Sequence, residues 1–276
     1  MENIYKDAVI KMERLEKEFL ELPETVIVGV VGASGPGAGR NPKDKYWNLS
    51  FSLIAWKELG GELHQSPLLL SKKVTDNELR EIQIRVKKES LVQFNVKLSK
   101  VSPFGDARAQ LISVLDAPDE VDLKAALEKF KEPVEITHPE FGTLTLDKSV
   151  DWFDGTVNWL GDSIRVSVSI DDDTGSPEGS LRTLEALCGD ARNWSKKITD
   201  YAVSSLLELK NDNWLMEDQH ELTETDFINA MRLDSITVHP DGEFEFWHDD
   251  GDLFLGHSIL ISGSLQDGPT DADIPG

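Results

Sequence analysis

Residues 235–263, SITVHPDGEFEFWHDDGDLFLGHSILISG, decide how the C-terminal half of this chain folds. Phe244 and Phe246 alternate with glutamates, which is the period of a half-buried strand. Residues 240–242, Pro-Asp-Gly, suit a tight hairpin turn, because glycine tolerates the positive φ that a two-residue connection needs. The run Leu253–Ile261 is almost entirely apolar. The stretch therefore predicts three consecutive antiparallel strands, with Leu253–Ile261 as a central one.

The residues before this stretch predict further strands and three helices. Hydrophobic periodicity places a strand pair at 135–146, strands at 150–159 and 163–170, and helices around 181–187, 194–209 and 224–231. Thr223 and Asp226 have the spacing of a capping box for the last helix. We therefore predict an α+β domain, in which the helices stack against one face of a mainly antiparallel sheet.

The N-terminal half begins with an amphipathic helix over residues 2–22, which Pro23 ends. Its apolar stripe consists of Tyr5, Ala8, Met12, Leu15, Phe19 and Leu22. Such a stripe packs on its own domain or on a second copy of the chain, and the first arrangement is the commoner.

Five strands and a second helix follow. The strands are predicted at 25–31, 46–56, 67–74, 91–98 and 107–115. After the third strand, residues 75–78 form a capping box that begins a helix. Three strands, a helix and two strands are the order of an oligonucleotide- or oligosaccharide-binding (OB) barrel. The sequence therefore predicts an OB-like β-barrel, although other small barrels share this order.

The glycine-rich segment 32–39 follows a strand and therefore has to be compared with a phosphate-binding loop. Such a loop opens a helix, whose first amides hold the phosphates together with a Lys-Ser/Thr pair. Here residues 40–42, Arg-Asn-Pro, and then another strand follow. We predict a flexible loop between two strands and no nucleotide site.

These patterns divide the 276 residues into four segments. They are an N-terminal amphipathic helix at 1–24, an OB-like barrel at 25–118, a linking helix at 119–131 that Asp119 could cap, and an acidic α+β domain at 132–276. The length suffices for two modest domains with proper cores.

The charge of the chain is uneven. Counting Lys and Arg against Asp and Glu, residues 1–130 carry about −1 and residues 131–276 about −22, which together give the total of −23. The acidic half repels a phosphate backbone, which argues against sequence-independent binding of nucleic acid there. It would attract a basic protein partner and speed the encounter. Solubility alone is the other explanation of such a charge.

Other classes of protein find little support in the sequence. No apolar run is long enough to cross a bilayer, and residues 1–19 lack the apolar core of a secretory signal, so a cytoplasmic protein is expected. The single cysteine, Cys188, excludes an intrachain disulfide and a cysteine-rich zinc site. No nucleophile elbow and no HExxH motif occurs, and no cofactor is predicted.

Four segments of the C-terminal half are similar to a bacterial family. They are PVEITHPEFGTLTLD (133–147), VDWFDGTVNW (150–159), YAVSSLLELKNDNWL (201–215) and residues 233–263. The resemblance is to the uncharacterised bacterial family "domain of unknown function 2262", over about residues 132–276, and is most specific at Asp250–Phe254 with Gly256-His257. Similar small domains occur near toxin genes, which implies an immunity role for some members. The resemblance brings no catalytic residues, and residues 1–131 lie outside it.

The most polar part of the decisive stretch offers candidate site residues. Asp249, Asp250 and Asp252 could offer oxygens to an ion, but calcium loops need more oxygens over a longer segment. Tight turns also favour aspartate and glycine, so we predict a turn here. His257, with Asp250 and Asp252, could instead hold a metal or perform acid–base chemistry. We favour a buried pair between His257 and an aspartate that locks the strands together.

The sequence thus leaves three functions open. We favour a non-enzymatic protein-binding module, of the type of an immunity protein that neutralises a basic toxin. Exposed Trp214 or Trp247 would be its anchor, and the acidic loops 171–173, 217–224 and 248–252 would surround it. The second function is a metal-assisted hydrolase that uses Asp250, Asp252 and His257.

The third function is an OB-type binder of single-stranded nucleic acid. Its binding face would use Trp47, Phe51, Phe94, Lys97 and Lys100. Phe51 and Phe94 also occupy alternating core positions, and the barrel is neutral instead of basic, so nucleic acid is not the expected partner. The oligomeric state stays open.

Overall fold

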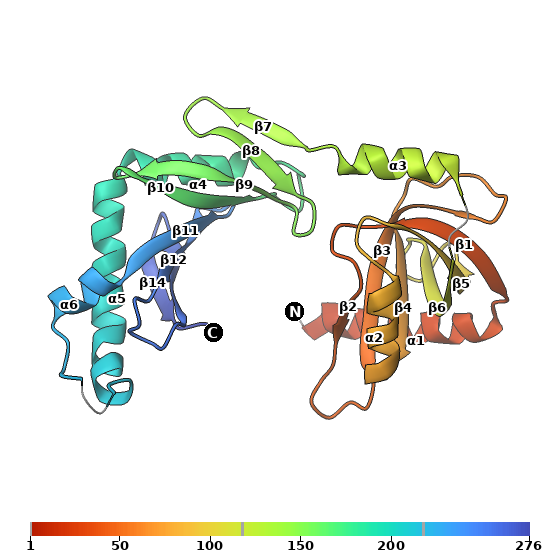
Figure 1. The fold of residues 1–276 in the computed structure, drawn as a ribbon, viewed down its shortest axis with the longest axis horizontal. Coiled ribbons are helices and arrows are strands. Elements are labelled where there is room, and N and C mark those ends of the chain that lie inside the picture. The colour runs from red at the N-terminus through yellow and green to blue at the C-terminus, as the bar shows by residue number, and fades with distance from the viewer. Residues whose placement is uncertain (1, 117–118, 217–218) are drawn as a thin grey trace. The chain divides into compact units, whose positions relative to one another are not determined.

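The computed structural model describes residues 2–116, 119–216 and 219–276. The chain divides into two compact units, Met1–Glu132 and Pro133–Gly276 (Figure 1). Each unit has its own sheet and its own hydrophobic core. The fold is α+β, as the sequence predicts, with a closed five-stranded barrel followed by a second sheet with helices.

The barrel of the N-terminal unit closes through its first strand. β1 (Glu24–Val31) pairs antiparallel with both β3 (Trp47–Glu58) and β5 (Leu91–Ser99). β4 (Leu68–Val74) pairs antiparallel with β3, and β6 (Arg108–Leu115) pairs antiparallel with β5 and parallel with β4. The strand order around the barrel is that of an OB-fold, so the prediction of an OB-like barrel is confirmed.

Strand alternation fills the barrel with apolar side chains. Along β3, Leu49, Phe51 and Leu53 are buried, while the serines between them face outward. The rings of Phe51 and Phe94 lie 5.6 Å apart inside the barrel. Both phenylalanines are therefore core residues, and neither can stack on a ligand at the surface.

The glycine-rich segment departs in part from its prediction. Residues Gly37–Gly39 form a short strand, β2, that pairs with β3. Glycine and alanine have no bulky side chain, so this segment can lie flat against the start of β3. The segment is thus partly ordered by the sheet, where the sequence predicted a flexible loop.

Helix α1 (Glu2–Glu21) packs on the barrel through its C-terminal half. Leu15 and Phe19 are 3% and 4% exposed, whereas Met12 is 43% exposed. Lys97 Nζ donates a hydrogen bond of 2.6 Å to the carbonyl of Phe19, near the end of the helix. Only part of the predicted apolar stripe is therefore covered, and the side chain of Tyr5 lies outside the described residues.

Helix α2 (Asp76–Arg85) begins with the predicted capping box. The Thr75 hydroxyl accepts a hydrogen bond from the Glu78 amide, and the Glu78 carboxylate accepts one from the Thr75 amide. Two of the four free amides at this helix start are thereby satisfied.

Helix α3 (Val121–Lys131) is attached to the barrel. Leu123 is fully buried in a cluster with residues of β1 and β3. Lys57 Nζ contacts both carboxylate oxygens of Asp122 at 2.9 Å and Glu120 Oε2 at 2.6 Å. The prediction that Asp119 caps this helix is wrong. Glu120 occupies the N-cap position and makes no side-chain cap hydrogen bond, while the Asp119 carboxylate pairs with Lys124.

The C-terminal unit is built on an eight-stranded sheet of order β14-β13-β12-β11-β10-β9-β8-β7. Its strands are β7 (Glu135–His138), β8 (Gly142–Asp147), β9 (Trp152–Trp159), β10 (Asp162–Ser169), β11 (Arg232–Val238), β12 (Glu243–Asp249), β13 (Ser258–Ser264) and β14 (Gly268–Asp273). All neighbours are antiparallel except β10 and β11, which are parallel. The mainly antiparallel sheet is as predicted.

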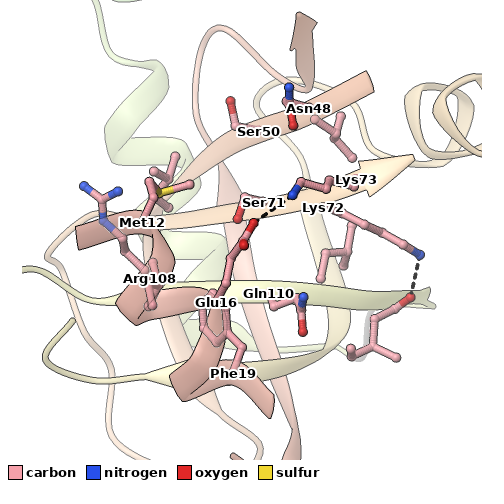
Figure 2. Close-up of a pocket in the computed structure, with 15 residues that line it drawn as sticks. Met12, Glu16, Phe19, Asn48, Ser50, Ser71, Lys72, Lys73, Arg108 and Gln110 are labelled. Atoms are coloured by element: carbon pink, nitrogen blue, oxygen red, sulfur yellow. Dashed lines mark hydrogen bonds and ion pairs between the residues drawn. The ribbon is translucent and has the colours of Figure 1, made fainter. Parts of the chain in front are cut away.

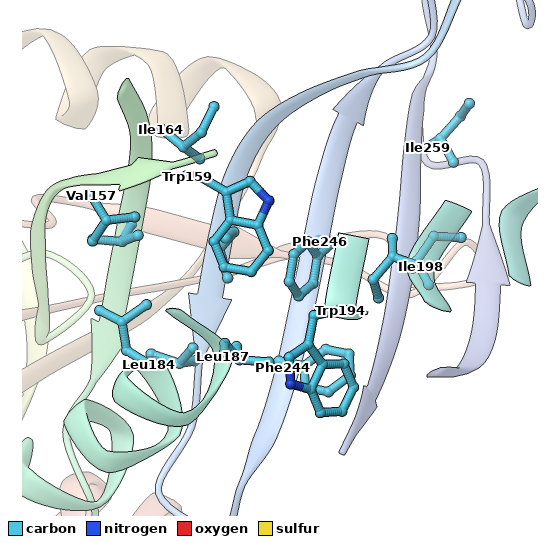
Figure 3. Close-up of a cluster of buried hydrophobic side chains, with 14 of the residues drawn as sticks. Val157, Trp159, Ile164, Leu184, Leu187, Trp194, Ile198, Phe244, Phe246 and Ile259 are labelled. Carbon is cyan, nitrogen blue, oxygen red and sulfur yellow. The ribbon is translucent and has the colours of Figure 1, made fainter. Parts of the chain in front are cut away.

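Three helices lie between β10 and β11 in the chain. They are α4 (Glu178–Gly189), α5 (Ala191–Asn213) and α6 (Glu224–Ala230), the last with the predicted capping box of Thr223 and Asp226. Trp194 of α5 meets the edge of Phe244 at 5.2 Å, and Phe244 meets Phe246 at 5.5 Å. Figure 3 shows these rings in the core between the helices and the sheet.

The decisive stretch folds largely as predicted, with two corrections. The turn before Phe244 contains three residues, 240–242, where the sequence suggested a two-residue connection. The His239 amide closes it by donating a hydrogen bond of 3.0 Å to the Glu243 carbonyl. The third strand begins at Ser258, not near Leu253. Leu253 and Phe254 are buried within a loop. The Asp250 carboxylate accepts hydrogen bonds from backbone amides of that loop, and these bonds are incompatible with an extended strand.

Candidate functional site

The Asp250 carboxylate organises the loop between β12 and β13. Its Oδ1 accepts a hydrogen bond from the Asp252 amide at 3.2 Å, and its Oδ2 accepts from Phe254 at 2.6 Å and Gly256 at 3.1 Å. The side chain is buried, whereas Asp249 and Asp252 are exposed. Asp250 thus shapes the turn, and three amides already occupy its oxygens.

A small polar cavity lies over this loop. Its volume is about 390 Å³, and it is lined by Arg232, Asp249, Asp250, Gly251, Asp252, Gly256, His257 and Ser258. The structure therefore brings together the three aspartates and the histidine that the sequence singled out, Asp249, Asp250, Asp252 and His257. Among the described residues, however, no group of three or more His, Cys, Asp or Glu side chains has the geometry to hold a metal ion.

His257 lies next to this loop without the predicted partner. Its Nδ1 is buried and, within the described residues, has no hydrogen-bond partner. Its ring meets Trp214 edge-on at 5.7 Å, and Trp214 also meets Phe254 at 5.5 Å. The predicted His257–aspartate pair is not formed, because Asp250 bonds the loop amides and the imidazole packs against an indole instead.

Lys210 is a buried residue for which the sequence contains no motif. Its Nζ donates to the Trp214 carbonyl at 2.7 Å and to Gln219 Oε1 at 3.3 Å. Burial lowers the pKa of Lys210, and the Asp250 carboxylate acts in the opposite direction. The ammonium group therefore ties the end of α5 to the segment that carries Trp214, near the Asp250 loop.

Two further titratable groups lie in apolar surroundings. Burial lowers the pKa of His248 to about 4, and its Nδ1 has no partner within the described residues. Burial also raises the pKa of the Cys188 thiol to about 11. His248 is neutral and Cys188 is a thiol at neutral pH, so neither has the character of an activated catalytic group.

The sheet surface opposite Phe244 and Phe246 carries a different set of residues, and we call it the outer face. Strand register aligns Asp154, Ser167, Thr237, Glu245, Ser262 and Asp271 in one row across β9 to β14. A neighbouring row contains Arg165, Ser235, Trp247, Leu260 and Asp273. The outer face is thus polar and acidic, with a tryptophan in its middle.

Glu245 connects the aromatic residues of the outer face. Its Oε2 accepts a hydrogen bond of 3.0 Å from Trp247 Nε1, and its Oε1 lies 3.8 Å from His239 Nε2. The His239 ring meets Trp152 edge-on at 5.9 Å. Trp247 and Trp152 are half-buried, and the side chains of Glu245 and His239 are 31% and 26% exposed. Strands β9 and β12 and the turn after β11 therefore hold one aromatic and carboxylate cluster at the surface.

Ser169 completes this cluster without providing a nucleophile. Its hydroxyl lies 3.2 Å from His239 Nδ1 and 3.3 Å from the Ser180 hydroxyl. A serine, a histidine and a glutamate are thus in line, but Ser169 is only 5% exposed. A substrate carbonyl could not reach the hydroxyl, so Ser169 orients the His239 ring. The sequence pointed to Trp247 but not to the cluster around it, because Trp152 and His239 lie far from β12 in the chain or beyond a turn and only the fold brings them together.

The acidic residues of the outer face have few basic neighbours. Arg165 forms an ion pair with Asp234 on the adjacent strand, and Arg232 is the register partner of Asp249. Glu243, Glu245, Asp271 and Asp273 lie on β12 and β14. The negative charge that the composition assigns to this half of the chain is therefore partly concentrated on one sheet surface.

The remaining predicted residues have structural partners. Lys97 bonds the end of α1, Lys100 pairs with Glu58, and Trp47 Nε1 donates to Asp76 at 2.9 Å. This hydrogen bond lowers the pKa of Asp76. Of the acidic loop 217–224, residues 217 and 218 lie outside the described residues. No helix in the described ranges is both long and apolar enough to span a membrane.

Comparison with known proteins gives family relationships without an activity. No curated protein matches this chain. One solved structure, "Structure and Conformational Change of a Replication Protein A Heterotrimer Bound to ssDNA", aligns with 9% identity and a TM-score of 0.29, over 52% of this chain and 38% of that chain. A likeness this slight carries no argument about the fold or the function of this chain.

Two family models match the chain, one in each unit. Residues 11–130 match a domain of unknown function, DUF7021, and residues 138–274 match the family described as "Uncharacterized protein conserved in bacteria (DUF2262)". The resemblance seen in the C-terminal sequence is thereby confirmed. The region that matches DUF7021 folds as an OB-like barrel, and the region that matches DUF2262 forms the α+β unit that follows it.

Proposed function

We propose that the C-terminal unit is a non-enzymatic protein-binding module and that its outer face binds a basic protein. The observation that carries this proposal is the cluster of Trp152, His239, Glu245 and Trp247 on an acidic sheet surface. Tryptophan is enriched among the residues that dominate binding energy in protein interfaces. A half-buried indole held by a carboxylate loses little conformational freedom on binding.

The charge of the outer face determines the kind of partner. Carboxylates on β9, β12 and β14 lie on the same sheet face as Trp247, and Arg165 is already paired with Asp234. A basic surface would meet them with complementary potential, which raises the association rate at low ionic strength. An immunity-type role, in which the unit covers a basic toxin, is the form of this function that the resemblance to toxin-linked domains suggests.

Trp247 is a better anchor than Trp214, the other candidate from the sequence. The Trp214 ring packs against Phe254 and His257 within its own unit. Trp247 instead lies on the outer face, where its indole Nε1 donates a hydrogen bond to Glu245. Binding through Trp247 would therefore require no rearrangement of the Asp250 loop.

The alternative of a metal-assisted hydrolase is less well supported. It requires free oxygens on Asp250 and an accessible nitrogen on His257, but three amides occupy the former and Nδ1 of the latter is buried. A hydrolase would also need a metal site, and no arrangement of described side chains offers one.

The test uses the full-length chain as bait in extracts of its source bacterium. A captured protein is then purified, and its affinity is measured by calorimetry at two salt concentrations. We expect a basic partner whose affinity falls about thirtyfold with Trp247→Ala, which corresponds to the 2 kcal/mol typical of a central interface residue. Glu245→Gln should weaken binding and reduce its salt dependence.

Glu208→Gln is the matched control for charge. Glu208 is an exposed residue of α5, the helix that packs on the opposite face of the sheet, so its loss should leave the affinity unchanged. A partner that binds the Trp247→Ala and Glu245→Gln variants as tightly as the original chain would show that the outer face is not the binding site.

A further inference from the structure

The charged side chains around a large cavity in the N-terminal unit are paired within that unit. The cavity, of about 620 Å³, lies between α1 and the strands β3, β4 and β6 (Figure 2). Glu16 Oε1 lies 2.8 Å from Lys73 Nζ, and Lys72 Nζ donates a hydrogen bond of 2.9 Å to a backbone carbonyl of β6. Arg108 donates to both carboxylate oxygens of Asp106, at 2.8 and 3.0 Å. These groups therefore stabilise the barrel and its first helix.

In the C-terminal unit, by contrast, one apolar side chain is exposed in a strained conformation. Leu255 is 58% exposed, more than any other large hydrophobic residue that the structure describes in this unit. Its φ is 61°, in the left-handed region, where the Cβ atom of a leucine comes too close to a backbone carbonyl oxygen. A single exposed leucine needs no explanation, but a leucine that the fold also holds in an unfavourable conformation does.

Leu160 has a similar conformation for a reason that does not apply to Leu255. Its φ is 56°, and it lies in the two-residue turn between β9 and β10. Such turns commonly require a positive φ at their central residues. Leu255 instead lies in the longer loop 250–257 between β12 and β13, whose length sets no such requirement. The conformation of Leu255 therefore has another cause.

The Asp250 carboxylate is that cause. Its Oδ2 accepts hydrogen bonds from the amides of Phe254 and Gly256, the two neighbours of Leu255, at 2.6 and 3.1 Å. Asp250 is 4% exposed and Phe254 is fully buried, so both are fixed in position. On the other side of the loop, a Cβ atom at Gly251 would clash with a backbone carbonyl oxygen at the end of α6. The loop is therefore held rigidly, with the Leu255 side chain at its surface.

The residues before Leu255 are buried in the core of the unit, whereas Leu255 is not. Leu253 and Phe254 belong to the core cluster, and the Phe254 ring meets Trp214 at 5.5 Å and Phe227 at 6.2 Å. The hydrogen bonds to Asp250 keep Leu255 outside this cluster. The unit thus exposes an apolar side chain and bears backbone strain, and burial in its own core compensates for neither.

The carboxylates beside Leu255 determine which kind of surface could cover it. Asp249 and Asp252 are exposed in or next to the same loop. Asp249 follows Trp247 by two residues on β12 and therefore lies on the outer face, so the loop continues that surface. Arg232, the register partner of Asp249, offsets one of these charges. A second copy of this acidic unit or an anionic membrane would bring like charges together, whereas a basic protein is complementary.

We propose that Leu255 is an apolar anchor that the Asp250 loop presents to the basic protein partner. The partner receives Leu255 in an apolar pocket, and basic residues around that pocket meet Asp249 and Asp252. This inference rests on the proposed function, because it names a second contact with the same partner. An apolar centre with a polar rim is the usual anatomy of a protein interface. A side chain that is held in place before binding also loses little conformational freedom on association.

The first experiment places the photoactivatable residue benzoylphenylalanine at position 255 of the full-length chain, which is produced in its source bacterium and irradiated there. We expect a covalent adduct with a basic protein, identified by mass spectrometry. The same residue at position 134 is the control, because Val134 is 43% exposed and lies next to β7, at the far edge of the sheet. The proposal is overturned if position 255 gives no adduct, gives adducts only with proteins that are not basic, or gives the same adduct as position 134.

The second experiment measures the affinity of the protein from that adduct, after purification, by calorimetry. Leu255→Gly should weaken binding about tenfold, which corresponds to burial of part of a leucine side chain. Glycine adopts a positive φ freely, so the melting temperature of the C-terminal unit should stay level or rise by about 2 °C. Weaker binding without lower stability cannot result from a loss of folding. Unchanged affinity, or a clear fall in the melting temperature, would show that Leu255 serves its own unit instead.

The Trp247→Ala variant separates this inference from the proposed function. If the adduct at position 255 and the affinity both persist in Trp247→Ala, Leu255 is an anchor and the outer face is not the binding site. If the partner depends on Trp247 but binds Leu255→Gly as tightly as the original chain, the outer face binds the partner and Leu255 is not an anchor.

Discussion

His248 is a neutral imidazole in the core of the C-terminal unit, and its ionisation makes folding sensitive to acid. Burial lowers its pKa from 6.5 to about 4, while contacts with the backbone of Ile259 and Phe246 act in the opposite direction. The unfolded chain therefore takes up the proton first as the pH falls. The stability that this residue confers is fully present above about pH 6.5 and is lost between that pH and about 4.

We expect the loss from His248 to reach about 3 kcal/mol in the free energy of unfolding. The His248→Leu variant removes the titrating group, so its stability should fall less steeply over this interval. Urea unfolding at several pH values measures both slopes. Equal slopes for the two proteins would show that the imidazole is already protonated, or hydrated, in the folded state.

The second prediction at this scale concerns Asp250 and Asp252. Asp250→Asn directs an amide group at backbone N–H donors, and it should cost about 2 kcal/mol of stability because buried donors lose their acceptor. Asp252→Asn removes the same charge from an exposed side chain at a φ of 67°, a conformation that asparagine tolerates. Its cost should be below about 0.5 kcal/mol.

Tryptophan fluorescence during urea unfolding reports both aspartate variants, because Trp214 contacts Phe254 and His257. A similar cost for the two variants would mean that net charge, and not the loop hydrogen bonds, is what matters.

At the scale of elements, the ion cluster of Lys57 fixes α3 to the barrel. Hydrogen bonds to Glu120 and Asp122 raise the pKa of Lys57, and the bond to Lys57 lowers the pKa of Asp122. These bonds join β3 to the first turn of α3, where acidic residues also interact favourably with the helix dipole.

We therefore expect Lys57→Met to speed hydrogen exchange of the α3 amides and to lower the melting temperature of the N-terminal unit. Lys124→Met is the control, since the exposed Lys124 side chain pairs with Asp119, which precedes α3 and does not belong to the barrel. Unchanged exchange in α3 after Lys57→Met would show that Leu123 alone holds the helix.

The elements also show how far local sequence patterns predict structure. The capping boxes at Thr75 and Thr223 fold as predicted, because every group in them lies within four residues. The predicted start of β13, at Leu253, was wrong, because an apolar run has the same composition in a buried loop and in a buried strand. The sequence of β14, GPTDAD, has no strand pattern, and the segment is a strand because it pairs with β13.

At the scale of the whole molecule, the two units differ by about 21 elementary charges, from −1 to −22. Like charges at that density destabilise a compact state, and added salt screens them. We expect residues 133–276, expressed alone, to fold and to gain stability as sodium chloride is raised. Residues 1–132 should fold and respond little. Thermal unfolding followed by circular dichroism measures both.

The division of the chain at Glu132 is itself tested by that experiment, since each segment keeps its sheet and its core. A segment without cooperative unfolding would show that the two units depend on each other. Equal salt responses would mean that the acidic residues of the C-terminal unit are too far apart to repel one another.

The amino-acid sequence by itself determined the order of most strands and helices, the OB-like barrel, the acidity of the C-terminal half and its resemblance to a bacterial family. These follow from periodicity, caps and composition, which act over short distances or over the chain as a whole. Only the tertiary structure decided that Trp152, His239, Glu245 and Trp247 form one cluster, and that α1 packs on the barrel through Leu15 and Phe19. Such neighbours are set by strand register and helix docking, which depend on the packing of residues far apart in the chain.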